Sequence, residues 1–132
     1  LSKYCLELTH IQQSDVDFAV EFNKALDAFY FWCNSNKTVF ISWGQFDKKH
    51  TLQEAQKKKY SGKIIEILES SGHHINLKDK FWAYYSARPK GLEKSLAKLG
   101  LAFEGIPHRG ITDAENIARI VKAMGVLLKL EL

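Results

Sequence analysis

The segment Thr38–Trp43 constrains the fold more than any other part of the sequence. Five of its six residues are β-branched or aromatic, and the run ends at Gly44. A short continuous run of this kind is typical of a strand that is buried on both faces. Because buried backbone N–H and C=O groups must find partners, such a strand cannot be buried alone. The run therefore requires a further strand, either in this chain or upstream of Leu1.

Most of the remaining chain predicts helices. Ser2 can cap a short helix over the first ten residues, and Ser14-Asp15 begins a second helical segment that reaches about Cys33. The cluster Asn34-Ser35-Asn36 breaks this pattern. Four further segments follow: a lysine-rich helix from Lys48 to about Tyr60, a strand or extended segment at Ile75–Leu77, an aromatic helix with Phe81, Trp82 and Tyr85, and a helix with Leu92, Leu96 and Leu99 on one face.

The clearest helix of the sequence lies near its end. Thr112-Asp113-Ala114-Glu115 fits a capping box, and Gly125 is expected to end the helix. Its apolar face consists of Ile117, Ala118, Val121 and Met124. A buried strand among many helices predicts an α/β fold, and 132 residues suit a single domain.

Composition excludes several classes of protein. Apolar residues make up 45% and charged residues 26%, which is typical of a soluble globular domain and not of a disordered chain. No apolar run approaches the ~20 residues of a membrane helix, and no signal peptide is recognisable. Cys5 and Cys33 form no C-x-x-C motif, so we expect free thiols and a cytoplasmic location. The net charge of +4 permits a polyanionic partner.

A carboxylate follows the predicted strand directly. In Trp43-Gly44-Gln45-Phe46-Asp47 the acid comes after the strand and a glycine turn. The end of a buried strand is a favoured place for catalytic carboxylates in α/β folds, because the strand fixes their position. The alternative is that Asp47 caps the helix that begins near Lys48.

A histidine precedes a second acid by five residues. Asp113 is expected in the first turn of the last helix, with His108 on the loop that leads into it. This arrangement suits a carboxylate that holds a metal ion beside a general base that takes a proton from water. The alternative is structural: the helix dipole favours an acid in the first turn in any case, and a loop histidine is commonly only solvated.

Other polar clusters allow two interpretations each. The basic cluster Lys48, Lys49, Lys57, Lys58, Lys59 and Lys63 is either a phosphate-contacting surface or the solvated face of a helix. His73-His74 has no accompanying cysteine or carboxylate at zinc spacing, which argues against a metal site.

Three stretches of the chain resemble DEDDh 3′–5′ exonucleases. Gly91–Ile120, which contains the pattern H-R-G-x-x-D-A-x-N-I-A-R from His108, is similar to the end of that domain. Ile41–Asp47 resembles the second motif of the family, and Leu6–Gln12 resembles the stretch between its first and second motifs. The branch of the family that this chain resembles contains the enhanced-RNAi and histone-mRNA exonucleases and the bacterial sporulation inhibitor KapD. This resemblance implies a ribonuclease H-like fold with a mixed sheet flanked by helices.

The resemblance also implies a reaction. It makes Asp113 a direct ligand of one divalent ion, His108 the general base, and Asp47 a residue that helps to hold a second ion. Two Mg²⁺ or Mn²⁺ ions are then expected, with hydrolysis of terminal phosphodiesters of single-stranded RNA or DNA to nucleoside 5′-monophosphates. RNA 3′ ends are the expected partner ahead of DNA.

Nucleic-acid contacts are predicted for three residues beside these motifs. Trp43 or Phe46 could stack on a terminal base, and Arg109 could contact a phosphate. For the two aromatic residues, packing in the core is the alternative. Asn116 and Arg119 belong to the matching stretch, but helix packing or surface pairing explains them equally well.

The sequence departs from the family at the first motif. An Asp-x-Glu belongs on the first strand, but Glu7 has Cys5 two residues before it, and Asp15-Val16-Asp17 has no glutamate. The resemblance therefore predicts a single exonuclease domain over residues 1–132 whose Asp-x-Glu motif and first strands lie upstream of Leu1. Alone, such a chain should bind metal weakly and be inactive. A second function stays open, namely a non-catalytic nucleic-acid-binding or protein-binding regulatory module of the same fold, similar to KapD.

Overall fold

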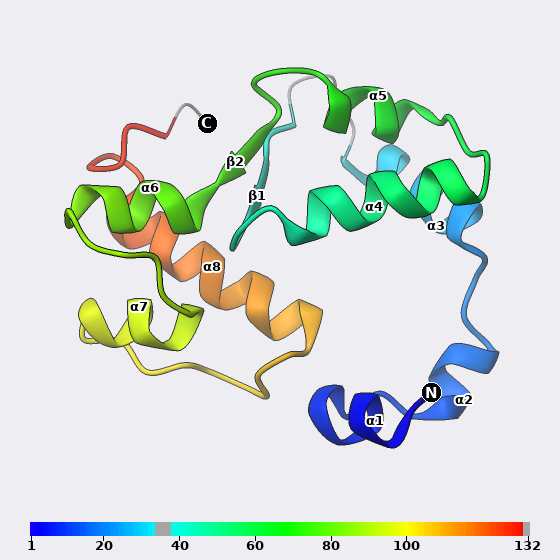
Figure 1. The fold of residues 1–132 in the computed structure, drawn as a ribbon, viewed down its shortest axis with the longest axis horizontal. Coiled ribbons are helices and arrows are strands. Elements are labelled where there is room, and N and C mark those ends of the chain that lie inside the picture. Colours follow the sequence, from blue (N-terminus) through cyan, green and yellow to red (C-terminus); the bar gives the residue numbers. More distant parts are fainter. Residues whose placement is uncertain (34–37, 131–132) are drawn as a thin grey trace. The chain divides into compact units, whose positions relative to one another are not determined.

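A computed structural model describes residues 1–33 and 38–130 of the chain. Its elements in chain order (Figure 1) are α1 (Lys3–Thr9), α2 (Gln13–Asp17), α3 (Phe22–Cys33), β1 (Phe40–Ser42), α4 (Phe46–Lys57), α5 (Lys63–Glu69), β2 (His74–Asn76), α6 (Leu77–Tyr84), α7 (Leu92–Lys98) and α8 (Gly110–Met124). The chain forms two compact units, one of Val20–Leu77 and the other of Leu1–Ala19 with Lys78–Leu132. The predicted break at Asn34-Ser35-Asn36 lies outside the described residues.

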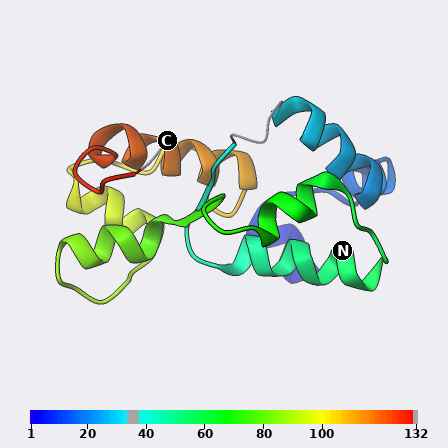
Figure 2. The same ribbon diagram turned by 90° about the horizontal axis from the view of Figure 1, so that it is seen from above.

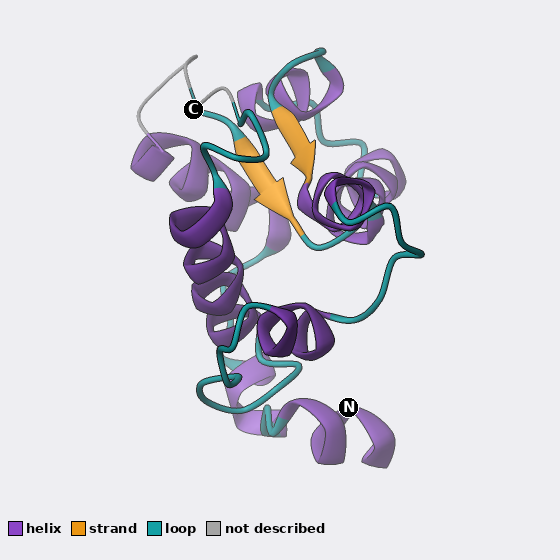
Figure 3. Ribbon diagram, turned by 90° about the vertical axis from the view of Figure 1, so that its left-hand side faces the viewer, coloured by secondary structure: helices purple, strands orange, loops and turns teal. Residues whose placement is uncertain are grey.

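The predicted strand finds its partner within the chain. β1 pairs in parallel with β2, with Phe40 opposite His74, Ile41 opposite Ile75 and Ser42 opposite Asn76 (Figure 3). The partner is thus the segment that the sequence predicts as a strand or an extended segment. The prediction that β1 is buried on both faces is wrong, because all three of its residues are only half-buried. In the described part of the chain β1 is paired along one edge alone.

Three helices enclose the core of the Val20–Leu77 unit. α5 contacts both α3 and α4 (Figure 2). Ala55, Ile64 and Ile65 are buried at their meeting point. Partly buried apolar residues pack around them: Phe22, Leu26, Tyr30, Phe40, Leu52 and Tyr60. The sequence analysis does not predict α5, because a seven-residue segment with four apolar residues is too short for its period to distinguish helix from strand.

The predicted helix from Ser14 to Cys33 is two helices. α2 begins at Gln13, where Asp15 accepts the N–H of Gln12 at 2.8 Å, and it ends at Asp17. Phe18 and Val20 are 89% and 69% exposed. These two apolar residues extend the helical period in the sequence, but they pack against nothing that would continue the helix.

The other unit is built around α6, α7 and α8. Its buried apolar side chains are Phe81, Trp82, Leu96, Ile120, Met124 and Leu128. The capping prediction for Thr112 is wrong, because the N-cap residue of α8 is Arg109, three residues earlier, and the helix begins at Gly110. The predicted end at Gly125 is confirmed, since its N–H donates to the Val121 carbonyl at 2.7 Å. The predicted Ser2 cap of α1 is also confirmed, because its hydroxyl accepts the Cys5 N–H at 3.2 Å.

A side-chain pair joins the two strands. The Ser42 hydroxyl lies 2.8 Å from Nε2 of His74 and donates to the Gly44 carbonyl at 2.7 Å. Burial lowers the pKa of His74 below its ordinary value. The positive charge of Lys48 lowers that pKa further, and the negative charge of Asp47 opposes the shift. His74 is therefore held neutral in the folded protein at neutral pH.

Two isoleucines on α8 offer a matched test of packing. Ile120 is completely buried, whereas Ile111 is 65% exposed. Ile120→Ala should lower the free energy of unfolding by about 2–5 kcal/mol, because it leaves a cavity in the core. Ile111→Ala should change it by less than about 0.5 kcal/mol. Urea unfolding followed by circular dichroism measures both, and equal losses would contradict this packing.

His74 should make stability depend on pH. Since its pKa is lower in the folded state, the unfolded chain binds the proton first as the pH falls through about 6.5. The free energy of unfolding should therefore decrease between about pH 7.5 and about pH 5.5, and His74→Gln should make that decrease smaller. Denaturant titrations at several pH values measure the slope, with the exposed His10→Gln as the control. An unchanged slope in His74→Gln would refute the assignment.

Candidate functional site

Asp47 lies in the first turn of α4, directly after β1 and a tight turn. Gly44 in this turn has φ +116°, a conformation that favours glycine. The N-cap residue of α4 is Gln45, so the alternative that Asp47 caps this helix is wrong. Helix α4 begins two residues earlier than predicted, which places Asp47 inside it. The Asp47 carboxylate is exposed and forms no hydrogen bond or ion pair with the residues that the structure describes.

Two aromatic residues before Asp47 differ in exposure. Phe46 is 73% exposed, and its ring stacks on the His50 ring one helical turn later, with centroids 5.4 Å apart and an interplanar angle of 7°. Trp43 is half-buried. Core packing therefore does not account for Phe46, whose ring is open to a ligand.

His108 and Asp113 lie next to each other at the start of α8. The backbone N–H of His108 donates to Oδ1 of Asp113 at 3.3 Å. His108 has φ +65°, an uncommon conformation for a residue other than glycine. The histidine is exposed and the aspartate is half-buried, so the pair faces solvent at one edge. The structure thus brings together the two residues that the sequence pattern selects.

Arg109 is half-buried, and its guanidinium points to α1. Its Nη1 donates to the backbone carbonyl of His10 at 3.4 Å. His10 is the C-cap residue of α1 and has φ +57°. Arg109 therefore joins the start of α8 to the end of α1, and the contact uses one of its five N–H donors.

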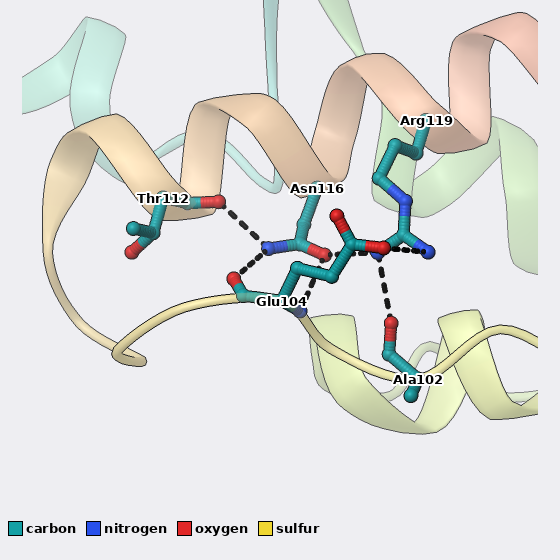
Figure 4. A network of polar contacts seen from close by, with 5 residues as sticks. All are labelled: Ala102, Glu104, Thr112, Asn116 and Arg119. Carbon is teal, nitrogen blue, oxygen red and sulfur yellow. Dashed lines mark hydrogen bonds and ion pairs between the residues drawn. The ribbon is translucent and has the colours of Figure 1, made fainter.

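A polar network fastens the loop of residues 102–109, which carries His108, to α8 (Figure 4). Its centre is Asn116, whose side-chain amide is completely buried. This amide bonds both the N–H and the C=O of Glu104, and Arg119 donates to the Ala102 carbonyl at 2.8 Å. The sequence analysis leaves Asn116 and Arg119 as packing or surface residues. The available signal is a polar amide one turn before Ile120, on the face of α8 that is otherwise apolar.

The paired histidines have structural partners. His73 Nδ1 lies 3.1 Å from the Thr38 carbonyl, and His74 bonds Ser42.

Among residues 1–33 and 38–130, no three His, Cys, Asp or Glu side chains gather in a group that could hold a metal ion. Asp47 belongs to the Val20–Leu77 unit, and His108, Arg109 and Asp113 belong to the other. That Asp47 joins them in one site therefore stays a prediction.

Within the described residues, no helix is both long and apolar enough to span a membrane.

Comparison with known proteins identifies the family. The family model for RNase T-type exonucleases matches residues 1–121. ERI1 exoribonuclease 2 of Danio rerio is 28% identical over 94% of this chain and 25% of its own length. The 3'-5' exonuclease Snipper of Drosophila melanogaster is 30% identical over 94% of this chain and 49% of its own. The chain thus spans between a quarter and a half of the length of these relatives.

Solved structures agree with the sequence comparison. The nuclease domain of 3'hExo, a DEDDh family member solved bound to rAMP, superposes with a TM-score of 0.81 at 27% identity. The match covers 96% of this chain and 65% of that one. A 3'-exonuclease that recognises the 3' end of the histone mRNA stem-loop superposes with a TM-score of 0.84 at 25% identity, over 96% of this chain and 58% of its own. With its ribonuclease H-like fold of the DEDDh nuclease type, the chain belongs to the exonuclease family.

Proposed function

We propose that the protein is a metal-dependent 3′–5′ exonuclease that hydrolyses terminal phosphodiesters of single-stranded nucleic acid to nucleoside 5′-monophosphates. The observation that carries the proposal is the pairing of His108 with Asp113 at the start of α8, joined by a 3.3 Å hydrogen bond. The resemblance assigns these two residues to the base and the metal ligand. Membership of the exonuclease family supports the reaction class.

The donor chemistry fits hard divalent cations. Asp113 and Asp47 present carboxylate oxygens, which Mg²⁺ and Mn²⁺ prefer to nitrogen or sulfur. One Asp113 oxygen accepts the His108 N–H, and the Asp47 carboxylate is unpaired within the described residues. These two residues would hold two ions, with Asp113 a direct ligand. When bound, the ions stabilise negative charge on the scissile phosphate and the leaving oxygen.

His108 has the freedom that a general base needs. Its backbone is fixed through Asp113, while its exposed imidazole makes no hydrogen bond with the described part of the chain. The ring can accept a proton from the attacking water when substrate is bound. The proton leaves with solvent, to which the ring is open.

RNA 3′ ends are the proposed substrate class. The solved relatives were studied with rAMP and with the histone mRNA stem-loop. In this chain the exposed Phe46 ring can stack on a terminal base, with Trp43 beside it, and the remaining donors of Arg109 can contact a phosphate. The basic residues Lys48 and Lys49 follow Asp47 on α4 and add positive charge there.

A second candidate is a non-catalytic regulatory module of the same fold, similar to KapD. The observation that favours it is the lack of a group of three metal-ligating side chains among the described residues. A protein of this kind would bind nucleic acid or a protein partner without cleaving a phosphodiester. Metal binding distinguishes the two candidates.

Removing the imidazole should abolish most turnover. In the intact protein, His108→Ala should lower kcat for a single-stranded RNA by ~10²–10⁴-fold, the range for losing a general base. Chromatography of released nucleoside monophosphates measures the rate. Mn²⁺ affinity measured by calorimetry should remain within about threefold, because the side chain is not a proposed ligand. Undiminished cleavage would refute the assigned base.

Removing a carboxylate should instead abolish metal binding. Calorimetric titration of Mn²⁺ into the intact protein should show binding that Asp113→Ala removes. Glu115→Ala is the matched control, because this exposed acid lies two residues further along the same helix. Binding that is absent from the unmodified protein, or that Asp113→Ala retains, would favour the regulatory module.

A further inference from the structure

We infer that Asn116 is a positioning residue that fixes the 102–109 loop and thereby the imidazole of His108. The inference rests on the proposed role of His108 as the base. Asn116 lies eight residues after the proposed base, so its position in the sequence does not suggest that its buried amide affects the reaction.

The Asn116 amide uses its whole hydrogen-bonding capacity. Its Nδ2 donates to the carbonyls of Glu104 and Thr112, both at 2.8 Å. Its Oδ1 accepts from the Glu104 N–H at 3.2 Å and from Arg119 Nη1 at 2.8 Å. The side chain therefore pairs both backbone groups of one loop residue, as a neighbouring strand would. A buried amide that donates two hydrogen bonds and accepts two has no alternative arrangement to adopt.

Three further contacts continue from Asn116 toward His108. The Thr112 hydroxyl lies within hydrogen-bonding distance of the Ile106 carbonyl, and 2.9 Å from that of Arg109. The Asp113 carboxylate holds the His108 N–H. Residues 112 and 113 precede Asn116 by four and by three positions, so both lie on the same side of α8 as Asn116. The loop is therefore fastened at 104, 106, 108 and 109 by a single helix face.

The fit between loop and helix is close at Gly105. This glycine has φ +84°, and a Cβ placed on it would lie 2.7 Å from Cγ2 of Thr112. The loop consequently has no room to move toward α8. Its freedom is to move away from the helix. The Asn116 hydrogen bonds to the C=O and the N–H of Glu104 oppose that movement.

Asn116→Asp removes both N–H donors of Nδ2 with almost no change in the shape of the side chain. The carboxylate can still accept from the Glu104 N–H and from Arg119, but it faces the carbonyls of Glu104 and Thr112 without a hydrogen to donate. Glu104→Gln is the matched control. It breaks the 2.8 Å ion pair of Arg119 with a carboxylate that is 71% exposed, yet it leaves both backbone bonds of Asn116 intact.

The test is a double-mutant cycle in the intact protein, with kcat and KM measured on a single-stranded RNA. Asn116→Asp should lower kcat by ~10²-fold, because a displacement of about 1 Å of a catalytic group costs that much. Its KM should change by less than about threefold. Added to His108→Ala, the same substitution should cost less than about threefold more, since no base is left to misplace. Glu104→Gln should keep full kcat.

The outcomes separate the inference from the proposed function. If His108→Ala has normal turnover, the proposed function fails. If His108→Ala is impaired but Asn116→Asp is normal, or lowers kcat equally in both backgrounds, Asn116 has only a structural role and the inference is wrong. If Asn116→Asp does not fold, Thr112→Val takes its place in the cycle. It removes the hydroxyl that holds the same loop, and the same lack of additivity is expected.

Amide hydrogen exchange adds a readout that does not depend on activity. In Asn116→Asp, exchange should accelerate in residues 103–109 and stay unchanged in residues 117–124 of α8. Equal protection of the loop in both proteins would overturn the inference.

Discussion

The hydrogen bonding of backbone N–H and C=O groups determines how both sets of candidate site residues are held. β1 is paired by β2, and the Ser42–His74 bond adds a side-chain link between the two strands. Within the part of the chain that the structure describes, no strand pairs with the 102–109 loop, and side chains of α8 bond its backbone instead. In each case hydrogen bonds to the backbone fix a segment next to a proposed functional group.

Both proposed metal ligands occupy the first turn of a helix. Asp47 directly follows Phe46, the first residue of α4, and Asp113 lies three residues after Gly110, the first residue of α8. The partial positive charge at a helix N-terminus favours a carboxylate there. A carboxylate that is free of ion pairs is available to a cation. The same placement explains why the sequence pattern alone left a purely structural interpretation open.

Sequence reasoning succeeded where a local pattern decides the outcome. The cap at Ser2, the strand at Phe40–Ser42 and the end of α8 at Gly125 are all set by residues within a few positions. It failed where the outcome depends on distant contacts. Phe18 and Val20 continue a helical period, but their side chains stay exposed among the described residues, and the helix breaks between Asp17 and Phe22. Thr112 fits a capping box, but its hydroxyl holds the incoming loop and lies inside the helix.

The sequence by itself determined the family and selected the residues that we propose as base and metal ligand, because the H-R-G-x-x-D-A-x-N pattern places distinctive residue types at fixed spacing. It also determined that the strand at Phe40–Ser42 needs a partner. Only the tertiary structure decided which segment that partner is. It also decided that Asn116 is buried and bonds the backbone of the loop, and is not a surface residue. The reason is that a local pattern specifies which backbone groups need hydrogen-bond partners. It does not specify the partners, because those of β1 and of the 102–109 loop lie far along the chain. Asn116 reaches back twelve residues to Glu104, and His74 lies 32 residues from Ser42.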